Sequence, residues 1–126
     1  MPAYDADLFL PPAPIARVVL RNPKTGQTIS DIALLIDSGA DVSLIPQLAV
    51  DQLDFTIASA ETYELQSFDQ HVSIAHALNL ELLFLDRRFR GKFLIIDQEI
   101  GILGRDILNH LSIVMDGPNL SWRESR

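Results

Sequence analysis

The sequence contains no cysteine, so disulfide bonds and thiolate metal sites are excluded. No apolar run approaches the roughly 18 residues that a membrane-spanning helix needs, so no membrane partner is expected. Basic residues are scarce as well, because 10 Lys and Arg stand against 17 Asp and Glu, for a formal net charge of −7. Phosphate neutralisation requires clustered Lys and Arg, so we expect no nucleic-acid partner. The one basic cluster, within residues 87–92, is interpreted as a solvated turn between two strands.

What is present is the composition of an ordinary globular protein, with 48% apolar and 21% charged residues in a chain of 126. That length suits one domain. The acidic N-terminus lacks a basic start followed by an apolar stretch, so no signal peptide is predicted and a cytoplasmic location is expected. Four prolines in the first 14 residues suit an extended arm. We therefore expect an arm over 1–14, a domain over 15–118 and a polar tail over 119–126.

Short β-rich segments separated by turn residues favour an all-β fold. Three antiparallel pairs are expected, the second with a polar tip, formed by Ile15–Leu20 with Thr28–Ile36, Tyr63–Leu65 with Val72–Ala75, and Ala77–Leu85 with Gly91–Ile96. Residues 46–54 admit a helical turn, and helical character near the end is confined to 107–111. No long amphipathic helix or internal repeat is present, so we predict one all-β, barrel-like domain with one short C-terminal helix.

The tripeptide Asp37-Ser38-Gly39 follows directly after a strand that is apolar on both faces. A carboxylate in that position is costly unless the structure uses or satisfies it. One interpretation is a functional turn in which Gly39 relieves backbone crowding and Asp37 faces a cleft. The other is a structural Asx or Ser turn that closes the strand. The tripeptide alone leaves both interpretations open.

The flanking residues add a resemblance to a known family. Residues 33–45, ALLIDSGADVSLI, resemble the active-site segment of the retroviral-type, or retropepsin-like, aspartic proteases. Residues 100–108, IGILGRDIL, resemble the apolar-apolar-Gly-Arg-Asn/Asp element that packs behind that segment in the family. The resemblance covers roughly residues 15–116 and implies a retropepsin-like acid-protease barrel. It also implies a catalytic Asp37, an active-site loop that includes Ser38, Gly39 and Ala40, and supporting residues Leu103 and Gly104.

The resemblance further implies an endopeptidase that is completed by dimerisation. This chemistry needs two carboxylates around one water, and the chain has one Asp-Ser-Gly, so a C2 homodimer would bring the two Asp37 side chains together. One Asp37 would act as base and the other, protonated, as acid on an extended peptide, without metal or cofactor. Ser38 would link the two loops and Gly39 would offer a backbone acceptor to substrate. His71 and His76 are too few to indicate a metal site.

Two structural expectations also come from the resemblance. Asp41 should form a bidentate ion pair with Arg105, tying the loop to the helix start. The hairpin tip should act as a flap, with candidates Gln66, Ser67, Phe68, Asp69 and Gln70. Family flaps usually carry glycines at the tip, and this one has none.

Two alternatives to a protease therefore stay open. The first is a dimer of the same fold that binds peptides without cutting them, and the second is an assembly domain whose role is dimerisation. The dimer contacts stay open too, because the family interleaves its chain ends in a shared sheet, whereas the proline-rich start and polar tail of this chain leave room for other strands.

Overall fold

The computed structural model describes residues 2–55, 61–66 and 72–125 and consists mainly of strands. Its elements in chain order are β1 Tyr4–Asp5, β2 Ala13–Arg21, β3 Thr28–Ile36, β4 Leu44–Pro46, α1 Gln47–Asp51, β5 Glu61–Gln66, β6 Val72–Phe84, β7 Arg87–Ile96, β8 Gly101–Leu103, α2 Arg105–Leu108, β9 Ile113–Asp116 and β10 Ser121–Glu124. In the part of the chain that is described, neither helix is long and apolar enough to cross a membrane.

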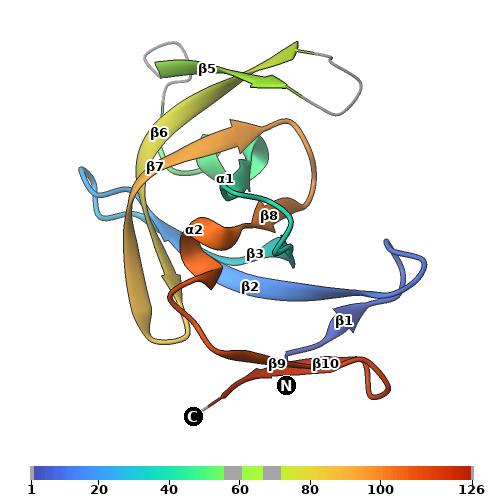
Figure 1. Ribbon diagram of the computed structural model, residues 1–126. Coiled ribbons are helices and arrows are strands. Elements are labelled where there is room, and N and C mark those ends of the chain that lie inside the picture. Colours follow the sequence, from blue (N-terminus) through green and yellow to red (C-terminus); the bar gives the residue numbers. More distant parts are fainter. Residues whose placement is uncertain (1, 56–60, 67–71, 126) are drawn as a thin grey trace.

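The main sheet closes on itself to form a six-stranded barrel (Figure 1). Its strand order is β1-β2-β3-β8-β4-β7-β6-β5, and a further pairing of β2 with β6 joins the two sides. Closure removes exposed strand edges and encloses one core. The core is apolar and includes the fully buried side chains Leu20, Leu34, Ile45, Leu80, Leu82, Leu103 and Ile107. The predicted all-β barrel is confirmed.

The expected strand pairs are also present. β2 pairs with β3, β5 with β6, and β6 with β7, all antiparallel. The β6–β7 turn lies at Leu85 and Asp86, whose φ angles of 53° and 61° suit a tight two-residue turn that follows the twist of the strands. Arg87 and Arg88 therefore belong to strand β7 and not to the predicted turn.

Helix content differs slightly from the prediction of one C-terminal helix. The short helix α2 begins at Arg105, two residues before the predicted segment. A second short helix, α1, occupies part of the segment where the sequence admitted a helical turn. It forms because Ala49 and Val50 become buried in the core, a tertiary contribution that short-range propensity does not reveal.

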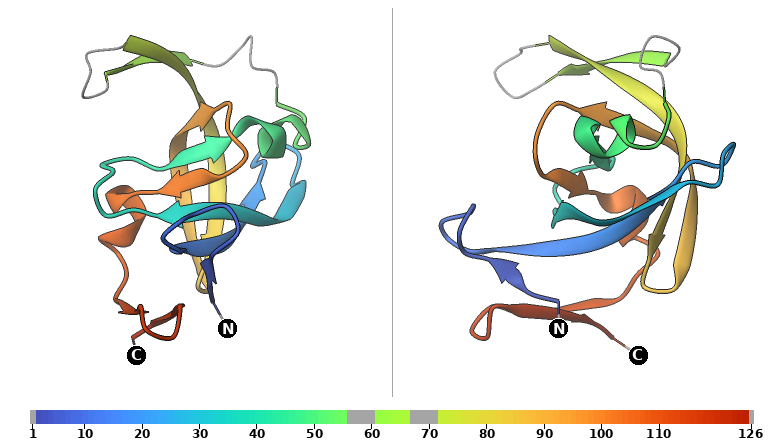
Figure 2. Two further views of the ribbon diagram at one scale, coloured as in Figure 1. Left: turned by 90° about the vertical axis from the view of Figure 1, so that its right-hand side faces the viewer. Right: turned by 180° about the vertical axis from the view of Figure 1, so that it is seen from behind.

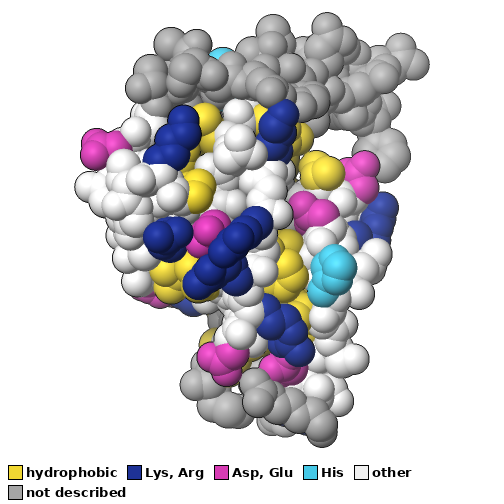
Figure 3. All heavy atoms as spheres, turned by 90° about the vertical axis from the view of Figure 1, so that its left-hand side faces the viewer, with side chains coloured by type: hydrophobic (Ala, Val, Ile, Leu, Met, Phe, Trp, Pro, Cys, Tyr) yellow, Lys and Arg dark blue, Asp and Glu magenta, His cyan; other side chains and the backbone are white. Residues whose placement is uncertain are grey.

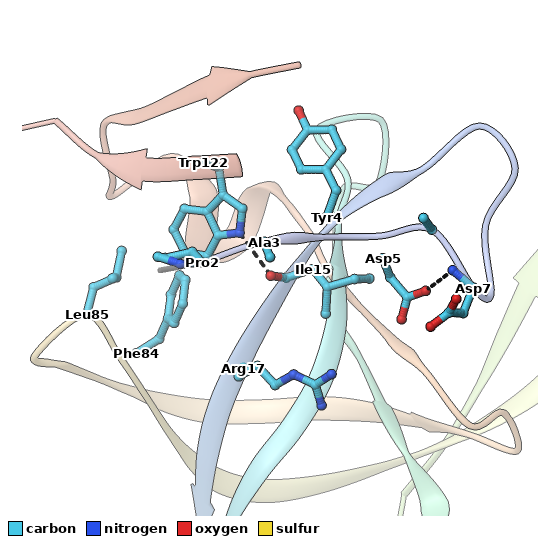
Figure 4. Close-up of a pocket in the computed structure, with 11 residues that line it drawn as sticks. Pro2, Ala3, Tyr4, Asp5, Asp7, Ile15, Arg17, Phe84, Leu85 and Trp122 are labelled. Atoms are coloured by element: carbon cyan, nitrogen blue, oxygen red, sulfur yellow. Dashed lines mark hydrogen bonds between the residues drawn. The ribbon is translucent and has the colours of Figure 1, made fainter. Parts of the chain in front are cut away.

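The two chain ends are built into the structure and are not a free arm and tail (Figure 2). β1 pairs with β2, β10 pairs with β9, and Ala3 bridges Ser121. The indole of Trp122 is 2% exposed, donates to the Ile15 carbonyl at 2.9 Å and lies 5.7 Å from the Phe84 ring (Figure 4). Burial of this large side chain outweighs the polarity of its neighbours in sequence, which had suggested a tail.

A buried carboxylate, Glu81, lies in the centre of the β2–β6–β7 surface. It is directly opposite Arg21 on β2 and Arg90 on β7, and its oxygens lie 3.1 and 3.3 Å from their guanidinium nitrogens. Arg88 contributes a third contact at 3.7 Å. Figure 3 shows Lys and Arg side chains gathered on one face of the molecule with acidic side chains among them. The basic cluster is therefore partly neutralised from within the sheet.

We predict that Glu81→Gln destabilises the protein by about 1–3 kcal/mol, because each charged hydrogen bond to the buried carboxylate is lost or weakened. The matched control is Asp31→Asn, which removes an exposed ion pair with Arg17 at 3.6 Å and should cost no more than about 0.5 kcal/mol. Urea unfolding at one fixed protein concentration measures both. Equal losses in the two variants would contradict a structural role for Glu81.

Candidate active site

The Asp37 loop begins where strand β3 leaves the barrel. β3 runs parallel to β8, and the Asp37 N–H continues the ladder by donating to the Leu103 carbonyl at 3.1 Å. The chain then turns: the Gly39 N–H donates to Asp37 Oδ1 at 2.9 Å and the Ala40 N–H donates to the Asp37 carbonyl at 3.2 Å. The backbone ladder and this turn together determine the position of the carboxylate.

The Asp37 carboxyl is half-buried, while Ser38 and Gly39 are exposed. The structure contains the Asx turn that one of the two interpretations of this tripeptide predicted, and its acceptor is Asp37 Oδ1. Oδ2 has no hydrogen-bond partner among the described residues. A Cβ on residue 39 would lie 3.1 Å from Asp37 Oδ1, so glycine lets the turn close tightly around the carboxylate. The same turn is therefore compatible with a carboxylate that keeps one oxygen available for chemistry.

The start of α2 packs directly behind this loop. The backbone N–H of Arg105 donates to the Ala40 carbonyl at 2.9 Å. A Cβ on Gly104 would lie 2.6 Å from the backbone of Val42 and 3.0 Å from the Ala40 carbonyl, so only glycine permits this approach. Leu103, directly before it, is fully buried in the core. The structure thus brings Leu103 and Gly104 against the loop that they were expected to support.

A partly buried hydrogen-bond network that sequence reasoning missed joins the same two segments. Ser43, 1% exposed, donates its hydroxyl to Asp106 Oδ1 at 2.6 Å and its N–H to Asp106 Oδ2 at 3.0 Å. The Ser43 hydroxyl in turn accepts the Gly104 N–H at 2.9 Å. The only sequence signal was a hydroxyl residue inside the otherwise apolar run from Val42 to Ile45. This network ties the far end of the Asp37 loop to α2.

The expected ion pair between Asp41 and Arg105 is not formed within the described part of the chain. The Arg105 guanidinium instead donates to the Ser38 carbonyl at 2.7 Å, and Asp41 is exposed. The carboxylate that ties the loop to the helix is Asp106, through Ser43. An exposed ion pair would add little stability once that buried connection exists. Arg105 still contacts the active-site loop, through the backbone of Ser38.

The hairpin predicted as a flap is present as β5 and β6, paired from Glu61 opposite Ala77 to Gln66 opposite Val72. Gln66 is the last residue of β5. The other candidates, Ser67, Phe68, Asp69 and Gln70, lie outside the described residues. In the left panel of Figure 2 the hairpin projects above the barrel on the side where the β3–β4 loop lies.

The histidines were expected to be strand residues. His76 lies in β6, opposite Ile95 on β7, and His71 is outside the described residues. Within residues 2–55, 61–66 and 72–125, no group of three His, Asp or Glu side chains is placed to hold a metal ion.

Comparison with known proteins agrees with the geometry. Residues 12–116 match the family model described as retroviral aspartyl protease. Among solved structures, the chain is similar to EIAV protease complexed with the inhibitor HBY-793, at 20% sequence identity and a TM-score of 0.57, covering 78% of this chain and 86% of that one. At such low identity this likeness bears on the fold alone. A search of curated proteins gives no significant match. Because the family model spans most of its length, the chain belongs to the retroviral aspartyl protease family and has that family's retropepsin-like barrel.

Proposed function

We propose that this protein is a homodimeric aspartic endopeptidase in which each subunit supplies Asp37. The observation that carries this proposal is the position of the Asp37 carboxyl: half-buried, held by the Gly39 N–H through one oxygen, and without a partner at the other among the described residues. Membership of the retroviral aspartyl protease family supports the assignment of that carboxyl to peptide hydrolysis.

A second subunit is needed because aspartic protease chemistry requires two carboxylates. The sequence has one Asp-Ser-Gly, and a two-fold axis next to the loop supplies the second. Two carboxyls at such close range cannot both ionise, so they share one proton and titrate as a unit. The pair thereby contains one base and one acid at the same time.

The reaction follows from that division. The ionised Asp37 removes a proton from a water held between the two carboxyls, and the water oxygen bonds to the carbonyl carbon of the peptide. The protonated Asp37 gives its proton to the carbonyl oxygen, which forms a neutral tetrahedral diol. The diol then collapses: the Asp37 that took the water proton gives it to the peptide nitrogen, the C–N bond breaks, and the other Asp37 takes a proton from a diol hydroxyl, so an acid and an amine leave and the pair again holds one proton. No step requires a metal or a cofactor.

The neighbouring residues have supporting roles in this proposal. Ser38 links the two loops across the axis, and Gly39 offers its carbonyl to an extended peptide. The hairpin of β5 and β6 covers the bound peptide and excludes water. A tip without glycine also favours a second candidate, a dimer that binds peptides but does not cut them.

We predict that wild-type protein cleaves an unstructured substrate such as casein and that Asp37→Asn lowers the rate on the order of 10³-fold or more, because the acid–base pair is destroyed. Dimer content, measured by sedimentation, should be unchanged. The rate should be highest at mildly acidic pH and fall above neutrality, because one carboxyl of the pair must keep its proton. A wild-type dimer that yields no products at any pH would favour the peptide-binding candidate.

A second prediction concerns the buried network behind the loop. Ser43→Ala leaves the buried Gly104 N–H without its acceptor and removes the hydroxyl bond to Asp106 Oδ1, so it should cost about 1–3 kcal/mol of unfolding free energy. The backbone N–H of residue 43 still donates to Asp106 Oδ2 in this variant. It should also lower the cleavage rate by more than its effect on folding explains, because the loop that positions Asp37 is anchored there. Ser112→Ala, at an exposed position, is the control and should change neither property. Urea unfolding measures the loss of stability, and casein cleavage under conditions where both variants are folded measures the loss of activity. A Ser43→Ala variant with wild-type activity would show that the network does not position the loop.

A further inference from the structure

A cavity of about 640 Å³ lies between the two chain ends and the barrel. Its walls come from β1 and the loop that follows it, from β2, from the end of β6 and its turn, and from β10. Among the described residues, no member of the Asp37 loop lines this cavity, so it is separate from the candidate active site. Binding sites for small organic ligands have volumes of this order. The cavity is therefore large enough to be a second binding site.

One end of the cavity is apolar and already packed. The rings of Trp122 and Phe84 form its floor, with their centroids 5.7 Å apart and an angle of 50° between their planes. The Trp122 indole is fixed by its hydrogen bond to the Ile15 carbonyl at 2.9 Å (Figure 4). Pro2 and Leu85, which are half-buried, add apolar surface at the same end. Because this wall is formed before any ligand enters, an aromatic ring can bind there at little cost in conformational entropy.

The opposite end of the cavity carries two carboxylates, those of Asp5 and Asp7 (Figure 4). Asp5 Oδ1 accepts the backbone N–H groups of Asp7 and Leu8, both at 2.8 Å, which holds the Asp5 carboxylate in place. Within the described part of the chain, Asp5 Oδ2 and the Asp7 carboxylate have no hydrogen-bond or ion-pair partner. Negative charge that is left unpaired in a concave site attracts a cation. This end of the cavity is therefore suited to an ammonium group.

A positive charge lines the same cavity. Arg17 on β2 has a side chain that is 56% exposed, and its Nε lies 3.6 Å from Asp31 Oδ1. An exposed ion pair at that distance is weak, so it does not commit the guanidinium to Asp31. The planar guanidinium can bind a carboxylate through two parallel hydrogen bonds. The charged part of the cavity thus offers partners to a ligand that carries both an ammonium group and a carboxylate.

We propose that this cavity binds a short peptide that has free ends and an aromatic side chain. The ammonium group bonds to the Asp5 and Asp7 carboxylates, the peptide carboxylate bonds to Arg17, and the aromatic ring lies at the apolar end. A ligand with an ammonium group alone leaves Arg17 unmatched, and one with a carboxylate alone places its charge beside two aspartates. The proposal does not depend on the proposed function, because neither Asp37 nor a second subunit takes part in this binding.

Trp122 is the only tryptophan of the chain and serves as the reporter of binding. Its fluorescence should change saturably as the dipeptide phenylalanyl-alanine is added to the wild-type protein, and calorimetry should give the same dissociation constant. Phenethylamine and phenylpropionate carry one of the two charges each. Both should bind at least about tenfold more weakly than the dipeptide, because each lacks one charge-assisted contact. Absence of saturable dipeptide binding by either method, or a single-charge ligand that binds as tightly, would overturn the proposal.

Variants assign the contacts. Asp5→Asn removes the charge but keeps a side-chain oxygen that can accept the same two backbone N–H groups, so the loop is preserved. It should raise the dissociation constant of the dipeptide at least about tenfold. The matched control is Asp51→Asn, the same change at an exposed position of α1 outside the cavity, which should leave binding as in wild type.

Arg17→Gln is a second variant that keeps the proposal testable if Asp5→Asn does not fold, which urea unfolding checks. Because Arg17 is exposed, this change should be tolerated. It should weaken binding of the dipeptide at least about tenfold and leave binding of phenethylamine unchanged, since that ligand has no carboxylate. Dipeptide affinities in folded Asp5→Asn and Arg17→Gln that equal the wild-type value would overturn the proposal.

Discussion

The connection between Ser43 and Asp106 is the interaction on which the rest of the site depends. It joins two segments 63 residues apart, and because Ser43 is 1% exposed, its hydroxyl cannot bond to water instead. A buried donor or acceptor without a partner is costly, so the loop and the helix start have to occupy one arrangement to satisfy each other. Gly104 makes that arrangement possible by letting the backbone of Val42 approach where a Cβ would collide. The position of Asp37 follows from this fit.

The local parts of the structure could be predicted from the sequence because they depend on short-range patterns. Short β-rich segments between turn residues predicted the β2–β3 and β6–β7 pairs, and the Asp37-Ser38-Gly39 segment with the Gly104-Arg105-Asp106 element identified the family and the barrel. The positions that failed depend on distant neighbours. Trp122 lies among polar residues in sequence yet packs on Phe84.

The same limit applies to the two charged connections. Glu81 is buried because three arginines from β2 and β7 surround it, which no local pattern reveals. The carboxylate that anchors the loop is Asp106 and not Asp41, although both lie near the motifs that were recognised. Motif spacing identifies the segments that meet, but which side chain makes the contact between them is decided by the backbone geometry.

A closed barrel leaves few backbone groups free for binding, and this determines where interactions can form. Six strands pair on both sides, so free edges are confined to the strands appended to the barrel. The edge of β1 lies beside the closed chain ends, where Ala3 bridges Ser121. β5 and β9 each have one strand neighbour among the described residues. One edge belongs to the hairpin expected to cover a peptide, and the other lies beside a pocket that Ser38 and Arg105 also line. Because strand pairing requires such an edge, an extended segment can add to the described part of this fold only at one of these appended strands.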